Sequence, residues 1–73
     1  MALSAEWARE EFSKLSGQTK SDVRAVLKIL RAKGGPAATK KIRALAEKRE
    51  WPRWVMLALC DIIRTAWERK LEL

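Results

Sequence analysis

The sequence contains no histidine and no tyrosine, and its only cysteine, Cys60, lies in an apolar run. Histidine and cysteine are common zinc ligands and common acids, bases and nucleophiles of enzymes. One cysteine cannot form a disulfide within the chain, and a thiol among apolar residues is typical of a reducing compartment. These absences predict a cytoplasmic protein that is not an enzyme and that holds no metal and no cofactor.

Long hydrophobic runs are also missing. The longest uncharged apolar run, residues 54–60, is seven residues long, whereas a membrane-spanning helix needs about 20. The first fifteen residues alternate charged and apolar positions and have no stretch of the signal-peptide type. We therefore expect an intracellular protein without a transmembrane segment.

The carboxylates do not form an obvious acid and base pair. Glu47 and Glu50 lie among Lys48 and Arg49 and are predicted to form surface ion pairs. Asp61 interrupts the most apolar stretch of the chain, and we interpret it as a structural residue. No glycine-rich loop has the spacing of a nucleotide-binding motif.

Strand signals are nearly absent, because β-branched residues are sparse and Ala, Leu, Lys, Arg and Glu dominate. A chain of 73 residues forms one domain at most. The sequence predicts an all-α fold, a compact four-helix domain over residues 1–73. The expected helices span about residues 5–16, 20–33, 36–49 and 52–69.

Capping and breaking residues set these boundaries. Ser4 is predicted to cap the first helix and Gly17 to end it. The second helix is expected to begin at a capping box that starts at Thr19, with Asp22 in its first turn. Pro52 separates the third helix from the fourth, because proline disfavours helical geometry at the residue before it.

Apolar residues recur at helical spacing and predict the core. The fourth helix is apolar on almost every side between residues 54 and 63, so we expect it to be the central helix. The predicted core consists of Ala8, Phe12, Leu15, Val23, Val26, Leu27, Leu30, Ala38, Ile42, Leu45, Ala46, Val55, Leu59, Ile62, Ile63 and Ala66.

Three large apolar side chains of the fourth helix, Trp54, Met56 and Trp67, exceed what three short helices can cover. We expect them to lie at a homodimer or partner interface. Core packing alone is the main alternative, and a ligand pocket is a lesser one.

The positive charge is concentrated in one part of the chain. Residues 20–49 hold ten basic and two acidic side chains, whereas the flanking segments are nearly balanced, and the whole chain carries +7. In the second helix the basic residues follow one face, opposite the valine and leucine face. The candidate nucleic-acid-binding residues are Lys20, Arg24, Lys28, Arg31, Lys33, Lys40, Lys41 and Arg43.

Several partners could use such a basic face. Contact with the phosphate backbone of nucleic acid is favoured, because displaced counterions would drive binding. An acidic protein surface, an anionic membrane surface, and a face that only keeps the domain soluble are the alternatives.

Residues 42–59 resemble a helix-turn-helix motif in their Leu45-Ala46 pair. The segment departs from the motif at Glu50, where the turn commonly has glycine, and its second helix offers apolar residues where base reading needs polar ones. The turn around Gly34 could instead present the third helix to a groove, although its apolar spacing fits the motif poorly.

The sequence thus predicts a non-enzymatic, small basic protein, with a possible regulatory role, that contacts nucleic-acid backbone through its second and third helices. The alternative is a small helical adaptor or inhibitor that docks on a larger protein through the tryptophan-rich fourth helix.

Overall fold

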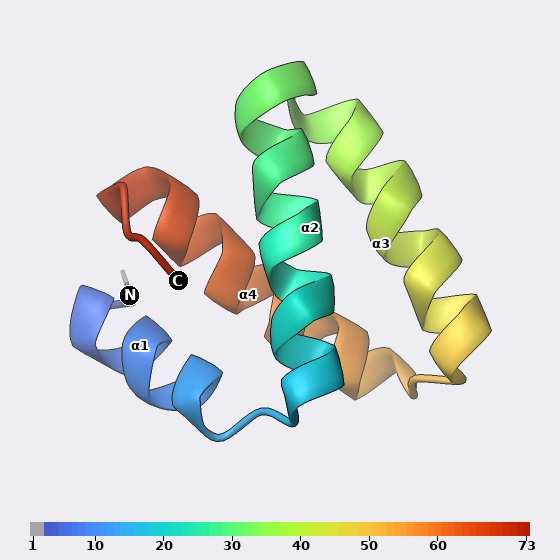
Figure 1. The fold of residues 1–73 in the computed structure, drawn as a ribbon, viewed down its shortest axis with the longest axis horizontal. Coiled ribbons are helices and arrows are strands. Elements are labelled where there is room, and N and C mark those ends of the chain that lie inside the picture. Colours follow the sequence, from blue (N-terminus) through green and yellow to red (C-terminus); the bar gives the residue numbers. More distant parts are fainter. Residues whose placement is uncertain (1–2) are drawn as a thin grey trace.

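Four helices surround a single core in the computed structural model, which describes residues 3–73. No strand occurs in this range, so the predicted all-α class is confirmed. Helix α4 contacts each of the other three helices, as expected for a central helix, and α2 crosses in front of it in Figure 1. The helices are α1 (Ala5–Ser13), α2 (Gly17–Lys33), α3 (Gly35–Arg49) and α4 (Arg53–Arg69).

The boundary between α1 and α2 differs from the prediction. Ser4 caps α1 as expected, since its side chain accepts a hydrogen bond from the backbone N–H of Trp7 at 3.0 Å. However, α1 ends at Ser13, whose hydroxyl donates to the carbonyl of Glu10, a local bond that competes with helix continuation. Gly17 therefore does not end α1.

Helix α2 begins three residues earlier than predicted, because Ser16 is its cap. The Ser16 hydroxyl accepts a hydrogen bond from the N–H of Thr19 at 3.2 Å, and Gly17 is the first helical residue. Ser16 therefore plays the capping role that was predicted for Thr19, three residues earlier in the chain.

A single residue, Gly34, joins α2 to α3. Its φ of 91° and ψ of −178° lie in a region that side chains exclude. Its N–H closes α2 on the carbonyl of Leu30, and Pro36 follows in the first turn of α3. The two helices therefore form a tight hairpin (Figure 1).

The open end of this hairpin is closed by an ion pair between α2 and α3. Asp22 is 7% exposed and accepts two hydrogen bonds from Arg49, at 3.0 and 3.1 Å. The prediction of Asp22 as a first-turn cap residue was wrong, and so was the assignment of Arg49 to surface pairs with neighbouring glutamates. Asp22 and Arg49 are 27 residues apart in the sequence, so the spacing of neighbouring residues could not predict their contact.

The turn between α3 and α4 has the geometry of a glycine turn without a glycine. Glu50 adopts a left-handed conformation with φ 57°, and the N–H of Trp51 bonds to the carbonyl of Ala46. Pro52 then caps α4, one residue before the helix begins at Arg53. The chain therefore turns sharply into the central helix.

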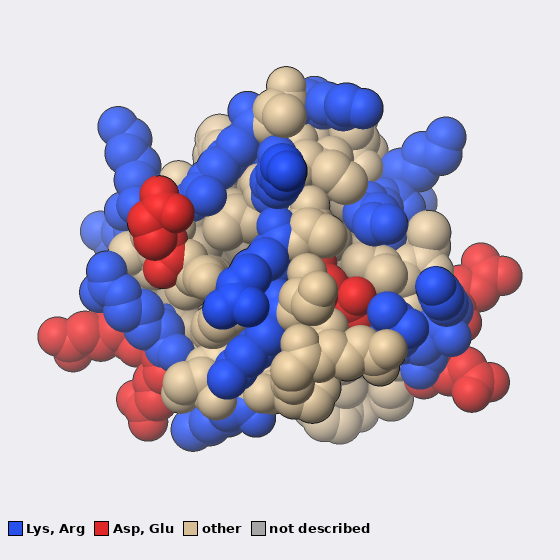
Figure 2. Space-filling model, in the orientation of Figure 1, with Lys and Arg blue, Asp and Glu red and all other residues tan. Residues whose placement is uncertain are grey.

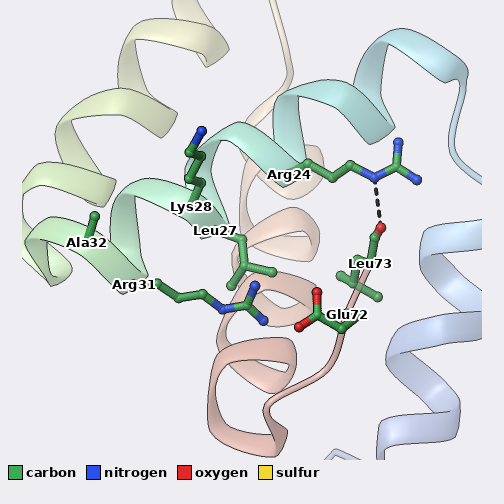
Figure 3. A pocket seen from close by; sticks show the side chains of 7 residues that line it. All are labelled: Arg24, Leu27, Lys28, Arg31, Ala32, Glu72 and Leu73. Atoms are coloured by element: carbon green, nitrogen blue, oxygen red, sulfur yellow. Dashed lines mark hydrogen bonds between the residues drawn. The ribbon is translucent and has the colours of Figure 1, made fainter.

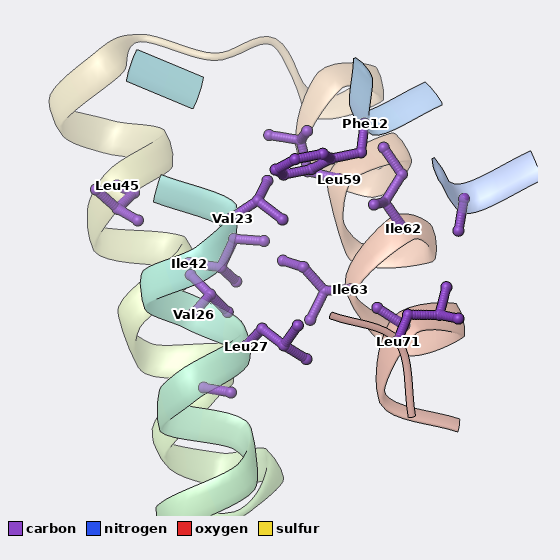
Figure 4. Packing of buried hydrophobic residues seen from close by; sticks show 13 residues of the cluster. Phe12, Val23, Val26, Leu27, Ile42, Leu45, Leu59, Ile62, Ile63 and Leu71 are labelled. Atoms are coloured by element: carbon purple, nitrogen blue, oxygen red, sulfur yellow. The ribbon is translucent and has the colours of Figure 1, made fainter. Parts of the chain in front are cut away.

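The core draws on all four helices and on the chain after α4 (Figure 4). Most predicted core residues are buried, but Leu15, Leu30, Ala46 and Val55 are only half-buried. Leu71 is an unpredicted core member at 5% exposure. The buried apolar residues are Ala8, Phe12, Val23, Val26, Leu27, Ala38, Ile42, Leu45, Leu59, Ile62, Ile63, Ala66 and Leu71.

None of the helices within residues 3–73 is both long enough and apolar enough to cross a membrane. In the same range, no buried side-chain nitrogen or oxygen lacks a hydrogen-bond partner.

Candidate nucleic-acid interface

Four basic residues of α2, which we call the basic stripe, lie along one face of that helix. Spacings of four, four and three residues place them on successive turns. Figure 2 shows Lys and Arg running along the length of α2, with most of the acidic residues toward the margins of the view. The basic stripe consists of Lys20, Arg24, Lys28 and Arg31.

The ring of Phe12 supports the first half of the basic stripe. Phe12 projects from α1 and is 7% exposed. The Lys20 ammonium lies 5.9 Å from the ring centroid and the Arg24 guanidinium 5.1 Å from it. A cation at this distance is attracted by the electrons of the ring, so α1 helps to hold both side chains in place.

Residues 71–73 position two of the stripe residues, Arg24 and Arg31. After α4, Lys70 adopts a left-handed conformation, and the N–H of Leu71 bonds to the carbonyl of Ala66 at 2.8 Å. The chain then passes beside α2, where the Nε of Arg24 donates to the backbone oxygen of Leu73 at 2.7 Å. Arg31 likewise donates to the backbone oxygen of Leu71.

A shallow hollow of about 490 Å³ lies between α2 and residues 71–73. Figure 3 shows Arg24 and Arg31 reaching across it, while the Lys28 side chain points away from residues 71–73. Glu72 is the one carboxylate among the residues that line it. A guanidinium has five N–H donors, so Arg24 and Arg31 each retain donors for an anion.

The predicted basic residues outside the stripe are Lys33, Lys40, Lys41 and Arg43, and all four are exposed. The stripe contacts α1 and residues 71–73, whereas α3 packs on the side of α2 that carries Asp22. The structure therefore brings the four stripe residues together, and their continuation onto α3 stays a prediction.

The resemblance to a helix-turn-helix fails at α4. The second helix of that motif presents polar side chains to the bases, but here Leu59 is buried and Val55 and Met56 are half-buried. The side chains that α4 exposes near its start include Trp54 and Leu57. The left-handed Glu50 gives the chain a turn like that of the motif. The helix that follows, however, lacks the polar side chains that would contact bases.

The tryptophan surface predicted on α4 is divided in the structure. Trp54 is 73% exposed and Trp67 is 49% exposed, whereas Met56 packs against the core. Leu57, which was not predicted, is 47% exposed. Its position one turn after Trp54 was the available signal.

Trp67 lies at the edge of a separate apolar groove between α2, α3 and α4, which includes Cys60. Burial raises the pKa of the Cys60 thiol, with the charge of Asp61 acting in the same direction. A thiol with a raised pKa is a poor nucleophile. This groove therefore lacks an activated group, and the described residues contain no cluster of three metal-ligating side chains.

Comparisons with protein-family models, with curated proteins and with solved structures find no match to this chain.

Proposed function

We propose that this protein binds the phosphate backbone of nucleic acid through the basic stripe of α2, without catalysing a reaction. The observation that carries the proposal is the stripe itself. Its four cations share one helix face without an acidic residue between them on that face, an arrangement that costs like-charge repulsion. A polyanion removes that repulsion when it binds.

Three of the four stripe residues are held in place before any ligand arrives. Lys20 and Arg24 lie over Phe12, and Arg24 and Arg31 donate to residues 71–73. Binding therefore costs less side-chain entropy than it would with freely moving lysines. The stripe runs over roughly 16 Å of helix, which spans several phosphates of one strand at about 3.4 Å of rise each.

Backbone contact is favoured over base reading. Guanidinium and ammonium groups bind phosphate oxygens irrespective of sequence, and the residues that line the hollow include no amide side chain of the kind that reads adenine. Lys33, Lys40, Lys41 and Arg43 would add contacts for a longer ligand. We thus expect binding that is steeply salt dependent and only weakly sequence selective.

The test is fluorescence anisotropy with labelled DNA and RNA, each single and double stranded, at two salt concentrations. If all four stripe residues contact phosphates of a duplex, affinity should fall roughly 150-fold between about 50 and 200 mM salt. A triple variant, Arg24→Gln, Lys28→Gln and Arg31→Gln, should lower the affinity about tenfold or more. Glutamine removes the charge and can still donate to a carbonyl oxygen.

A matched triple variant separates the stripe from net charge. Arg9→Gln, Lys14→Gln and Lys48→Gln remove the same number of charges from α1, from the residue that follows it and from the exposed side of α3. This control should bind almost as well as the parent. Equal losses in the two triple variants, or no binding at low salt, would refute the proposal for the stripe.

A second candidate is a small adaptor or inhibitor that docks on another protein through α4. The 73% exposure of Trp54 favours it, because tryptophan is a frequent anchor of protein interfaces. Acrylamide should quench Trp54 fluorescence in the isolated protein, and a bound partner should shield it. A spectrum that acrylamide leaves unchanged in dilute protein would contradict an exposed anchor.

A further inference from the structure

The outward face of α4 is electrically neutral on a strongly basic protein. Its four charged residues balance, whereas the chain as a whole carries +7. Two copies of the chain therefore repel each other least when they approach through this face. The α4 face consists of the exposed residues Arg53, Trp54, Leu57, Ala58, Asp61, Arg64 and Glu68. Two other exposed residues of α4 lie outside this face, because Arg69 donates to the carbonyl of Leu3 and Trp67 lines the groove between α2, α3 and α4.

The order of the charges along α4 distinguishes between two ways of pairing. A parallel pair in register would place identical residues opposite each other, and Asp61 would face Asp61 of a second copy. An antiparallel pair centred near residue 61 instead brings Arg53 toward Glu68 of the second copy, and Asp61 toward Arg64. The midpoints of these two ion pairs lie only two residues apart along α4, which is about 3 Å of helix rise. One antiparallel arrangement can therefore accommodate both ion pairs.

We propose that the protein forms an antiparallel homodimer through the α4 face. The interface is isologous, so each ion pair occurs twice about the dyad. Ala58 is small and permits close approach of the two helices. Leu57 would lie along the aliphatic part of Arg64 of the second copy, which buries apolar surface at the centre of the face.

Trp54 anchors each end of the interface. It is 73% exposed, and the antiparallel pairing places it near Glu68 of the second copy. An aromatic side chain that becomes buried beside a charged pair is a common arrangement of binding hot spots.

The dimer does not depend on nucleic-acid binding. Helix α2 packs against α4 through the buried side of α4, and the basic stripe faces α1 and residues 71–73. The α4 face can therefore pair while both stripes remain accessible.

Charge reversal tests the pairing by sedimentation velocity over a range of protein concentrations. Asp61→Arg and Arg64→Asp should each raise the dimer dissociation constant about tenfold or more. The double variant, which exchanges the two residues, should restore the parent value. The single variants change the net charge in opposite directions, so weakening in both cannot arise from overall repulsion.

Two further variants complete the experiment. Trp54→Ala should abolish the dimer, whereas Lys48→Asp, which makes the same charge change as Arg64→Asp on the exposed side of α3, should leave it intact. Circular dichroism checks that each variant stays helical. A parent that stays monomeric at its highest soluble concentration, or a double variant that fails to recover, would overturn the second copy as the occupant of this face.

Discussion

Arg24 shows what sequence can and cannot say about a single binding residue. Its place in the basic stripe follows from helical spacing, so the sequence was sufficient to nominate it. Its contacts with the Phe12 ring and with the backbone of Leu73, 49 residues away, follow from the packing of α1 and residues 71–73. Local spacing carries no information about such partners. The sequence therefore predicted which cations form the stripe, but not the contacts that hold their side chains in place.

Cys60 allows a prediction about chemical reactivity. Because burial raises the pKa of its thiol above the ordinary value of 9.0, the native protein should react with a disulfide reagent about tenfold more slowly than the urea-unfolded chain near pH 8. Thiol kinetics with and without urea provide the measurement. Equal rates in the two states would show that the thiol is not shielded.

The same shift predicts a dependence of stability on pH. The folded state holds the Cys60 proton more tightly than the unfolded state, so this contribution is complete below about pH 9. It is lost as the pH rises through the higher folded pKa. A comparison of the parent with Cys60→Ala by urea unfolding should show a difference between them that changes only at alkaline pH.

At the scale of elements, the ion pair between Asp22 and Arg49 should hold the α2 and α3 hairpin closed. Asp22→Asn leaves the guanidinium without its charge partner, and Arg49→Gln leaves a buried carboxylate, so each should lower the thermal midpoint by roughly 5 °C or more. The double variant should lose less than the sum of the two. Lys48→Gln, beside Arg49 but exposed, is the control.

Additive losses in that cycle would mean that the two side chains stabilise the fold separately. Scanning calorimetry of the four proteins provides the midpoints, and near-ultraviolet circular dichroism reports whether tertiary packing persists.

Helix existence could be predicted from sequence better than helix boundaries. The end of α3 at Arg49 and the end of α4 at Arg69 are as predicted, and Pro52 accounts for the break after α3. The start of α2 was misplaced because Ser16 and Thr19 both resemble caps. Two cap candidates three residues apart have similar local energies, so local spacing does not decide between them.

At the scale of the whole molecule, one core joins all four helices, with a radius of gyration of 11.2 Å. Most of this core was predictable, because an apolar residue recurs at every turn that faces inward. Leu71 was not, since it follows the last helix and no periodic pattern includes it. The left-handed Lys70 returns the chain to the core. Because this position is not a glycine, the sequence did not indicate the left-handed conformation.

Leu71 should therefore matter to global stability. Leu71→Ala removes a side chain that is 5% exposed and should lower the free energy of unfolding by about 2–3 kcal/mol, a large share of the roughly 4–11 kcal/mol expected for a domain of this length. Urea unfolding followed by circular dichroism measures the loss. Glu72→Gln, one residue further and exposed, should leave stability unchanged. Equal stability of the two variants would contradict this prediction, because residues 71–73 would then lie against the core without stabilising it. Their backbone oxygens could then not serve as fixed partners that order Arg24 and Arg31 in the basic stripe.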